Sequence, residues 1–207
     1  MIKRSFTMKK AVIFGASGNT GKYITRKLMA EENVELSVFV RDPAKLADID
    51  TANINVIKGD ALNGKDVKKA MEGQDILVCS LEGDVLSMAK NIVAALPDTT
   101  VSRIIWITGM GIHGEITGVA GFMLKQLAKK RPEYITAADT IFASGVDATL
   151  LRCGGIKNGD NEVYDLTKEG VQPRGDRSVE RAAIAACIAD MIKNEELGKN
   201  ESLAITN

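Results

Sequence analysis

The sequence has 207 residues, slightly more than one typical domain, and that length is enough to bury a hydrophobic core. Hydrophobic residues make up 45% and charged residues 26%, the usual balance of a soluble globular protein. Because 27 basic residues balance 27 acidic ones, we expect no general attraction to nucleic acid or to a membrane surface, and no apolar run reaches membrane-spanning length.

The first 14 residues, MIKRSFTMKKAVIF, are basic and end in a short apolar run that leads directly into GASG. A secretory signal peptide has a longer apolar region followed by a cleavage site of small residues. We therefore expect residues 1–7 to be an extension, with Met8 as an alternative start, and the domain to occupy residues 8–207.

Short β-branched runs alternate along the chain with segments that have the 3.6-residue apolar period of a helix. The predicted strands are residues 10–14, 35–40, 54–58, 75–80, 103–108 and 148–153, and the predicted helices between them are residues 21–32, 63–73, 84–96 and 132–145. Strands that are apolar on both faces and alternate with helices indicate a parallel sheet covered on both sides. The fold class predicted is therefore α/β, a single doubly wound parallel sheet.

The regular alternation stops after Cys153. Residues 154–177 are rich in turn-forming residues, with a short strand predicted at 163–166. A helix is predicted at 178–194 with Ser178 as its N-cap, followed by a last strand at 201–206. We expect this C-terminal third to form a small cap over the carboxyl edge of the sheet.

Three glycines, Gly15, Gly18 and Gly21, lie between the first strand and the first helix in the pattern G-x-x-G-x-x-G. In a dinucleotide clamp the first glycine permits the sharp turn, the second lets the backbone approach the pyrophosphate, and the third lets the helix pack on the sheet. The N–H groups of the helix then face the anion. This context favours a clamp over a plain turn, and the polar residues of the loop can add hydrogen bonds: Ser17, Asn19 and Thr20.

The segments VIFGASGNTGKYI, VFVRDPAKL, VIKGDALN, DILVCS and ASGVDATLLR together resemble the atypical short-chain dehydrogenase/reductases. The closer resemblance is to the small NAD(P)-binding NmrA-like branch, which also contains flavin and biliverdin reductases. It extends from about Ala11 to the C-terminus. It implies a Rossmann fold and a bound dinucleotide.

The second strand ends in VFVRDPAKL, where a dinucleotide-binding fold distinguishes NAD from NADP. Arg41 can bind the 2′-phosphate of NADP in a bidentate manner, and Lys45 lies within reach of the same phosphate. An acidic Asp42 would instead suit the ribose of NAD. However, Asp42 precedes Pro43, and this pair is typical of a helix N-cap followed by its first residue. We therefore predict NADP as the cofactor.

Two further strand ends complete the predicted cofactor site. The resemblance implies that Asp60 and Ala61 lie at the adenine, although Asp60 after Gly59 is also typical of a turn. Ser80, which ends DILVCS, would line the pyrophosphate and ribose side.

Relatives with the usual catalytic set place Tyr-x-x-x-Lys on one helix, because positions i and i+4 share a helix face. Here Tyr134 is present, but the fourth residue after it is Ala138. Lys130 precedes Pro132 and is expected in a separate helix, so it is a poor substitute. Tyr134, the candidate proton donor, is therefore more typical of a packing or pocket residue.

Thr108 ends the strand RIIWIT, where the family's active-site serine or threonine would lie beside the nicotinamide. Its hydroxyl could bind a carboxamide or a substrate oxygen, and a strand-end threonine is the alternative. The following loop, GMGIHGE, contains His113, which we expect to be an exposed loop residue rather than a proton donor.

Two functions remain open from the sequence. One is an NADPH-dependent reductase of a small substrate, in which hydride transfer relies on the positioning of cofactor and substrate and solvent supplies the proton. The other is an NADP(H)-binding sensor or regulator without turnover. A sugar-nucleotide epimerase is weaker, because those enzymes usually keep Tyr-x-x-x-Lys and a longer substrate domain. The three widely spaced cysteines are expected to be buried thiols in a reducing cytoplasm.

Overall fold

The computed structural model describes residues 8–113, 116, 118–173 and 177–207. The predicted extension at residues 1–7 therefore lies outside the described residues, and the alternative start, Met8, is the first residue described. Within that range, no helix is long and apolar enough to cross a membrane.

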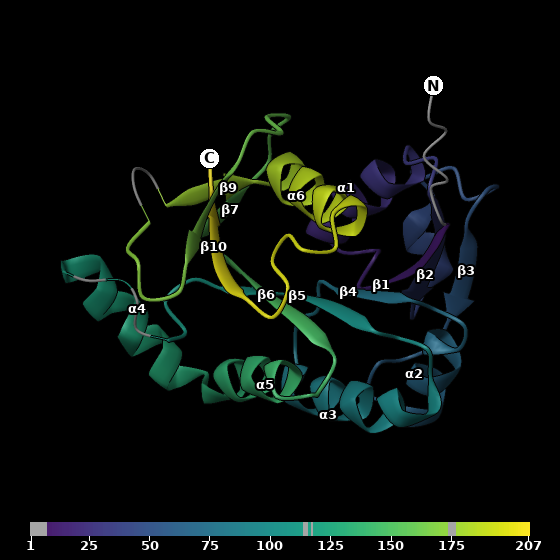
Figure 1. The fold of residues 1–207 in the computed structure, drawn as a ribbon, viewed down its shortest axis with the longest axis horizontal. Helices are drawn as coiled ribbons and strands as arrows, with labels where there is room; N and C mark the ends of the chain where they lie inside the picture. The colour runs from purple at the N-terminus through teal and green to yellow at the C-terminus, as the bar shows by residue number, and fades with distance from the viewer. Residues whose placement is uncertain (1–7, 114–115, 117, 174–176) are drawn as a thin grey trace.

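The predicted doubly wound sheet is confirmed. Eight strands form one sheet in the order β3-β2-β1-β4-β5-β6-β10-β8, with every neighbouring pair parallel except the last (Figure 1). The strands are β1 (Lys9–Phe14), β2 (Val34–Val40), β3 (Asn55–Lys58), β4 (Ile76–Cys79), β5 (Arg103–Gly109), β6 (Asp147–Cys153), β8 (Asp165–Lys168) and β10 (Ser202–Thr206). Strand order reverses beside β1, because the chain passes to β2 on one side and later to β4 on the other. That reversal is where an open α/β sheet forms a crevice at its carboxyl edge.

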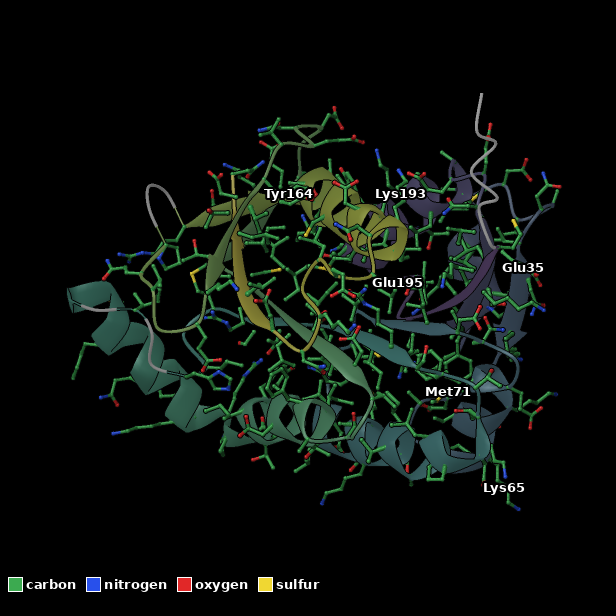
Figure 2. All side chains as sticks on the ribbon, in the orientation of Figure 1. Glu35, Lys65, Met71, Tyr164, Lys193 and Glu195 are labelled. Atoms are coloured by element: carbon green, nitrogen blue, oxygen red, sulfur yellow. The ribbon has the colours of Figure 1, made fainter. Side chains whose placement is uncertain are left out.

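Helices cover both faces of the sheet, as the apolar strands require (Figure 1). One face packs against α1 (Asn19–Met29) and α6 (Arg181–Lys193), with Ile24 and Ile188 in the shared core. The other packs against α2 (Gly64–Met71), α3 (Val85–Ala95) and α5 (Pro132–Phe142). Figure 2 shows the resulting division on α2: Lys65 points into solvent, whereas Met71 is buried between the helix and the sheet.

Two local predictions in the C-terminal third are wrong in detail. The strand predicted at 163–166 is β8, which begins two residues later and runs antiparallel to β10. Ser178 is not a helix N-cap: it begins the short strand β9 (Ser178–Glu180), and α6 starts at Arg181. Ser178 is extended because β9 pairs with β7 (Gly155–Lys157), a pairing that no local pattern indicates.

The C-terminal third contributes more than a cap. β10 and β8 extend the main sheet, and α6 packs beside α1 on one face. The separate β7–β9 ribbon follows directly from β6 and leads directly into α6, so it places the first residue of α6 at the carboxyl edge of the sheet. The helix α4 (Gly118–Lys130) follows β5 and projects away from the rest of the molecule (Figure 1).

Candidate dinucleotide site at the carboxyl edge

Two glycines of the loop between β1 and α1 are required by the fold itself. Gly15 has a φ of +85°, which favours glycine, and a Cβ there would lie 2.0 Å from the carbonyl oxygen of Ser80. A Cβ on Gly21 would lie 2.1 Å from the carbonyl oxygen of Gly15. Gly15 therefore lets the loop pass the end of β4, and Gly21 lets α1 pack against the loop.

Gly18 is different, because packing within the protein constrains it much less than Gly15 and Gly21. Its φ of −74° and ψ of 165° suit any residue, and a Cβ would meet only the carbonyl oxygen of Gly15 at 3.3 Å. Gly18 is exposed and lines the cavity beside the loop. A missing side chain at this place fits a ligand that approaches the backbone closely.

The cavity at this edge has a volume of about 480 Å³, within the usual range for a small-molecule site. All the predicted cofactor residues except Gly21 and Thr108 line this cavity. The ten that line it are Gly15, Ser17, Gly18, Asn19, Thr20, Arg41, Lys45, Asp60, Ala61 and Ser80. Gly21 lies beneath the loop, and Thr108 lies at the end of β5.

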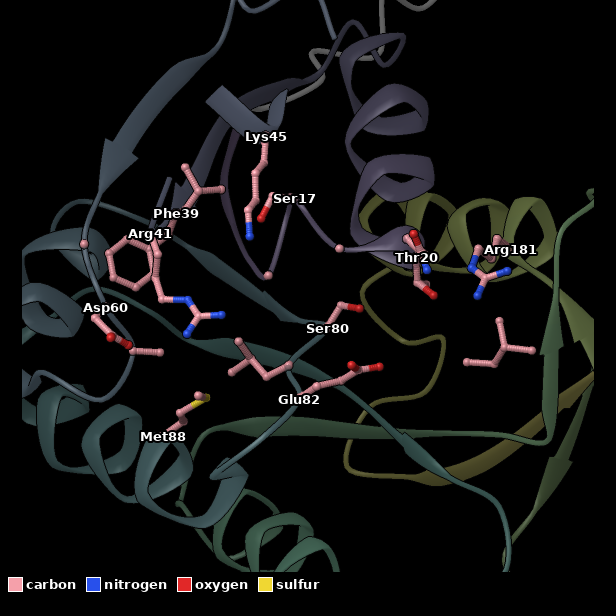
Figure 3. A pocket seen from close by; sticks show the side chains of 18 residues that line it. Ser17, Thr20, Phe39, Arg41, Lys45, Asp60, Ser80, Glu82, Met88 and Arg181 are labelled. Atoms are coloured by element: carbon pink, nitrogen blue, oxygen red, sulfur yellow. The ribbon is translucent and has the colours of Figure 1, made fainter. Parts of the chain in front are cut away.

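One end of the cavity carries a concentration of positive charge. Figure 3 shows Arg41 and Lys45 projecting toward the space beside Ser17. Asp42 is occupied in the predicted way: its Oδ1 accepts a hydrogen bond of 3.1 Å from the Ala44 backbone N–H and caps the short 3₁₀ helix Pro43–Leu46. The residue that could have read a ribose hydroxyl is therefore used to start a helix, whereas Arg41 faces the cavity.

Asp60 and Ala61 line the cavity near Arg41 but also hold a turn. Asp60 Oδ1 accepts a hydrogen bond of 3.0 Å from the Leu62 N–H, and the Asp60 N–H donates to Asp66 Oδ2 at 3.0 Å. The Ala61 carbonyl accepts from Asn91 Nδ2 at 3.0 Å. Asp60 therefore stabilises a turn, which was one of the two roles that the sequence left open. Its carboxylate also lines the cavity.

Sequence reasoning missed several residues that line the cavity. These residues belong in turn to β2, the loop after β4, α3, the β7–β9 ribbon and α6: Phe39, Glu82, Met88, Ile156 and Arg181. Phe39 could have been found, because it lies near the end of β2, two residues before Arg41. Arg181 had no local signal, since only the ribbon and the packing of α6 on α1 bring it to the cavity.

Thr108 is buried at the end of β5, with 7% of its surface exposed. Its Oγ1 makes no hydrogen bond with the described residues. It lies beside the fully buried Arg152 of β6 in the strand register. A buried hydroxyl of this kind normally has a hydrogen-bond partner. The Thr108 hydroxyl is therefore suited to bind a ligand or a neighbouring loop.

Tyr134 lies in the first turn of α5 and does not line the described cavity. Its hydroxyl accepts a hydrogen bond of 3.4 Å from the Gly83 N–H, and the Arg131 guanidinium lies 5.7 Å from the centre of its ring. Ala138, one turn further along the helix, is fully buried. Lys130 is the last residue of α4, so it belongs to a separate helix as predicted.

His113 is not the exposed loop residue that we predicted, since only 21% of its side chain is exposed. Its Nδ1 lies 2.8 Å from Glu169 Oε1, and its Nε2 lies 3.2 Å from Asp139 Oδ1. The imidazole thus bridges the end of β8 and α5, because the antiparallel pairing of β8 carries Glu169 to this place. This is a structural bridge rather than a group directed at the cavity.

The three cysteines are free and buried, as predicted. Burial raises the pKa of the Cys79 and Cys153 thiols, and raises that of Cys187 to about 12. These side chains are therefore neutral thiols at physiological pH rather than nucleophiles. Among the residues that the structure describes, no group of three or more His, Cys, Asp or Glu side chains could hold a metal ion.

Comparison with known proteins links this geometry to a family. Residues 15–195 match the family described as NAD(P)H-binding. A Rossmann-fold NAD(P)-binding family protein from Shigella flexneri is 30% identical, with a TM-score of 0.81 over 97% of this chain and 94% of that one.

More distant relatives share the fold. A short-chain dehydrogenase/reductase from Veillonella parvula in complex with NADP is 22% identical, with a TM-score of 0.81 over 96% of this chain and 94% of that one. An anaerobilin reductase from Escherichia coli O157:H7 is 17% identical, with a TM-score of 0.75 over 95% and 96% of the two chains. An uncharacterised chloroplastic protein of Arabidopsis thaliana is 24% identical over 91% of this chain and 73% of its own length.

Proposed function

This chain belongs to the NAD(P)H-binding family, and we propose that it is an NADPH-dependent oxidoreductase that reduces a small organic substrate. The observation that carries the proposal is the set of basic groups at one end of the cavity, Arg41 and Lys45, in a site whose glycine loop leaves room for a diphosphate. NADPH, when bound, would supply the hydride. The protein's own part is to hold the cofactor and to orient the substrate against it.

The preference for NADP rests on how the end of β2 is built. A guanidinium at position 41 provides two parallel donors for a phosphate, and Lys45 adds a second positive charge from the next turn of chain. The neighbouring carboxylate of Asp42 is committed to the Ala44 N–H. The V. parvula relative with NADP bound shares the fold and supports the choice.

The nicotinamide end is proposed to lie beyond Ser80, toward the end of β5. Thr108 is the candidate there, because its buried Oγ1 has no partner in the described part of the chain. A hydroxyl held in this way could bind the carboxamide or a substrate oxygen and keep the reacting atoms in line. Solvent would supply the proton, since no lysine stands one turn after Tyr134.

The proposed function is tested by NADPH consumption, followed at the nicotinamide absorbance, across flavins, quinones, tetrapyrroles and aldehydes. Turnover of one class with NADPH preferred over NADH would support it. Absence of turnover on every class, together with tight NADP binding, would instead support a cofactor-binding sensor. That second candidate is favoured by one observation, the fully buried Ala138 where related enzymes carry a catalytic lysine.

We propose a cytoplasmic location on the basis of the three free, buried thiols, which suit a reducing compartment. Fractionation of the native cells, with antibody detection of the protein, would test this. Recovery in an oxidising or membrane-enclosed compartment would contradict it.

Replacing Arg41 with alanine is expected to weaken NADP binding by about 10- to 150-fold, the effect of losing a charge-assisted hydrogen bond of roughly 1.5–3 kcal/mol. NAD, which has no 2′-phosphate, should lose little affinity. Titration calorimetry with both cofactors would measure the difference. Equal losses of affinity for the two cofactors would mean that Arg41 has a structural role. If the unaltered protein bound NAD more tightly than NADP, Asp42 would be the residue that selects the cofactor.

Thr108→Val is expected to lower kcat/KM by about tenfold, because it removes a hydroxyl and keeps the shape. The free energy of unfolding should stay the same or rise slightly, since the buried hydroxyl that is removed has no hydrogen-bond partner among the described residues. Tyr134→Phe, the matched loss of one hydroxyl, should retain most turnover, because the Tyr134 hydroxyl binds the Gly83 N–H rather than facing the cavity. A hundredfold loss in Tyr134→Phe with unchanged cofactor affinity would identify Tyr134 as the acid after all.

A further inference from the structure

Arg181 is the first residue of α6, yet it lines the same cavity as the glycine loop. Figure 3 shows its guanidinium beside Thr20, in the first turn of α1. Two features bring it there: the β7–β9 ribbon, which ends at Glu180, and the packing of α6 alongside α1. The cavity therefore has a cation at the end opposite Arg41 and Lys45.

One nitrogen of the guanidinium is held by the segment between β7 and β8. Arg181 Nη1 donates a hydrogen bond of 2.7 Å to Asn158 Oδ1. The neighbouring Glu180 accepts a hydrogen bond of 2.9 Å from the Asn161 N–H. This bond also links the segment between β7 and β8 to the start of α6. Arg181 Nε is buried without a hydrogen-bond partner among the described residues. A positioned arginine with unused donors beside a cavity is suited to an anionic ligand.

The carboxylates that line the cavity leave this charge available. Asp60 lies near Arg41 and accepts from the Leu62 N–H. Glu82 also lines the cavity, but within the described chain it forms no ion pair with Arg181. Among the described residues, neither of these two acids therefore forms an ion pair with Arg181.

NADP carries two separated anionic groups, a 2′-phosphate and a diphosphate. Arg41 and Lys45 stand together at one end of the cavity, where one anionic group would be bound. Thr20, in the first turn of α1, lies between that end and Arg181 in Figure 3, and Gly18 lines the same cavity. A helix N-terminus and an arginine that line the same part of a cavity form a site for a diphosphate.

We propose that Arg181 binds the diphosphate of the cofactor together with the glycine loop and the first turn of α1. The inference rests on the proposed function, because it assumes that a dinucleotide occupies the cavity. It makes Arg181 a cofactor-binding residue that serves NADP and NAD equally, in contrast to Arg41. It also assigns a role to the β7–β9 ribbon, which holds the start of α6 against the cofactor.

The test compares the affinities of NADP and NAD for the full-length protein and for Arg181→Met, by titration calorimetry. Both cofactors should bind at least tenfold more weakly, by similar factors. Lys157→Met removes one positive charge from an exposed position on the same ribbon and should change neither affinity. Arg181→Lys keeps the charge but loses the planar set of donors, so an intermediate loss is expected. Thermal unfolding of each variant checks that it is folded.

Other results would overturn the inference. A loss for NADP alone would assign Arg181 to the 2′-phosphate, and unchanged affinities with a raised KM for substrate would assign it to the substrate. If the unaltered protein bound neither cofactor, the proposed function would fail with it. If the unaltered protein bound both and Arg181→Met did too, only this inference would fail.

Discussion

Replacing Gly18 with valine is expected to abolish dinucleotide binding in a protein that still folds. The position has an ordinary extended backbone, with φ −74° and ψ 165°, and a Cβ would meet only one protein atom closer than 4 Å. The added side chain would instead occupy the cavity where the pyrophosphate approaches the loop. A loss of at least a hundredfold in affinity, about 2.7 kcal/mol, should be seen by titration calorimetry with NADP.

Gly18→Ala is the graded control, because a single methyl group fills less of the cavity and should cost less affinity than valine. Circular dichroism and thermal unfolding should show both variants folded, with transitions close to that of the unaltered protein. If the valine variant is folded and binds NADP as tightly as before, the loop is a turn and not a clamp.

Replacing Gly15 with alanine is expected to destabilise the whole protein, by about 2–5 kcal/mol. An alanine there would adopt a φ of +85° and place its Cβ 2.0 Å from a backbone oxygen at the end of β4. The left-handed backbone costs roughly 1–2 kcal/mol and the overlap with immovable backbone adds roughly 1–3 kcal/mol. Chemical denaturation followed by far-UV circular dichroism would measure the change in unfolding free energy.

Gly73→Ala separates these two causes. Gly73 also has a positive φ, +66°, but its Cβ would meet no atom within 4 Å. Alanine at 73 should therefore cost only the backbone strain, roughly 1–2 kcal/mol. Equal losses at 73 and 15 would show that the approach of Ser80 to the loop does not constrain Gly15.

Most of the sheet could be read from the sequence because its signals are local. Six β-branched runs became β1 to β6, and no boundary moved by more than one residue. The same locality explains Asp42 and Pro43, whose capping geometry needs only the Ala44 N–H two residues along the chain. Such features depend on neighbouring residues, so their patterns carry enough information to place them.

The prediction failed where pairing over a distance decided the structure. Ser178 reads as a helix N-cap, but it is extended because β9 pairs with β7. His113 reads as an exposed loop residue, but the antiparallel pairing of β8 with β10 brings Glu169 to its imidazole. In both places the local preference is weak, and the free energy of strand pairing outweighs it.

By itself the sequence determined the fold class, the glycine loop at the first crossover and the basic residues at the end of β2. These follow from hydrophobic period and from short-range backbone geometry. The tertiary structure alone decided which of the three glycines the packing of the fold requires, and it alone brought Arg181 to the same cavity as the loop. The reason is that close approaches such as that of Gly15 to Ser80, and of α6 to α1, join segments far apart in the chain, so no pattern within one segment encodes them.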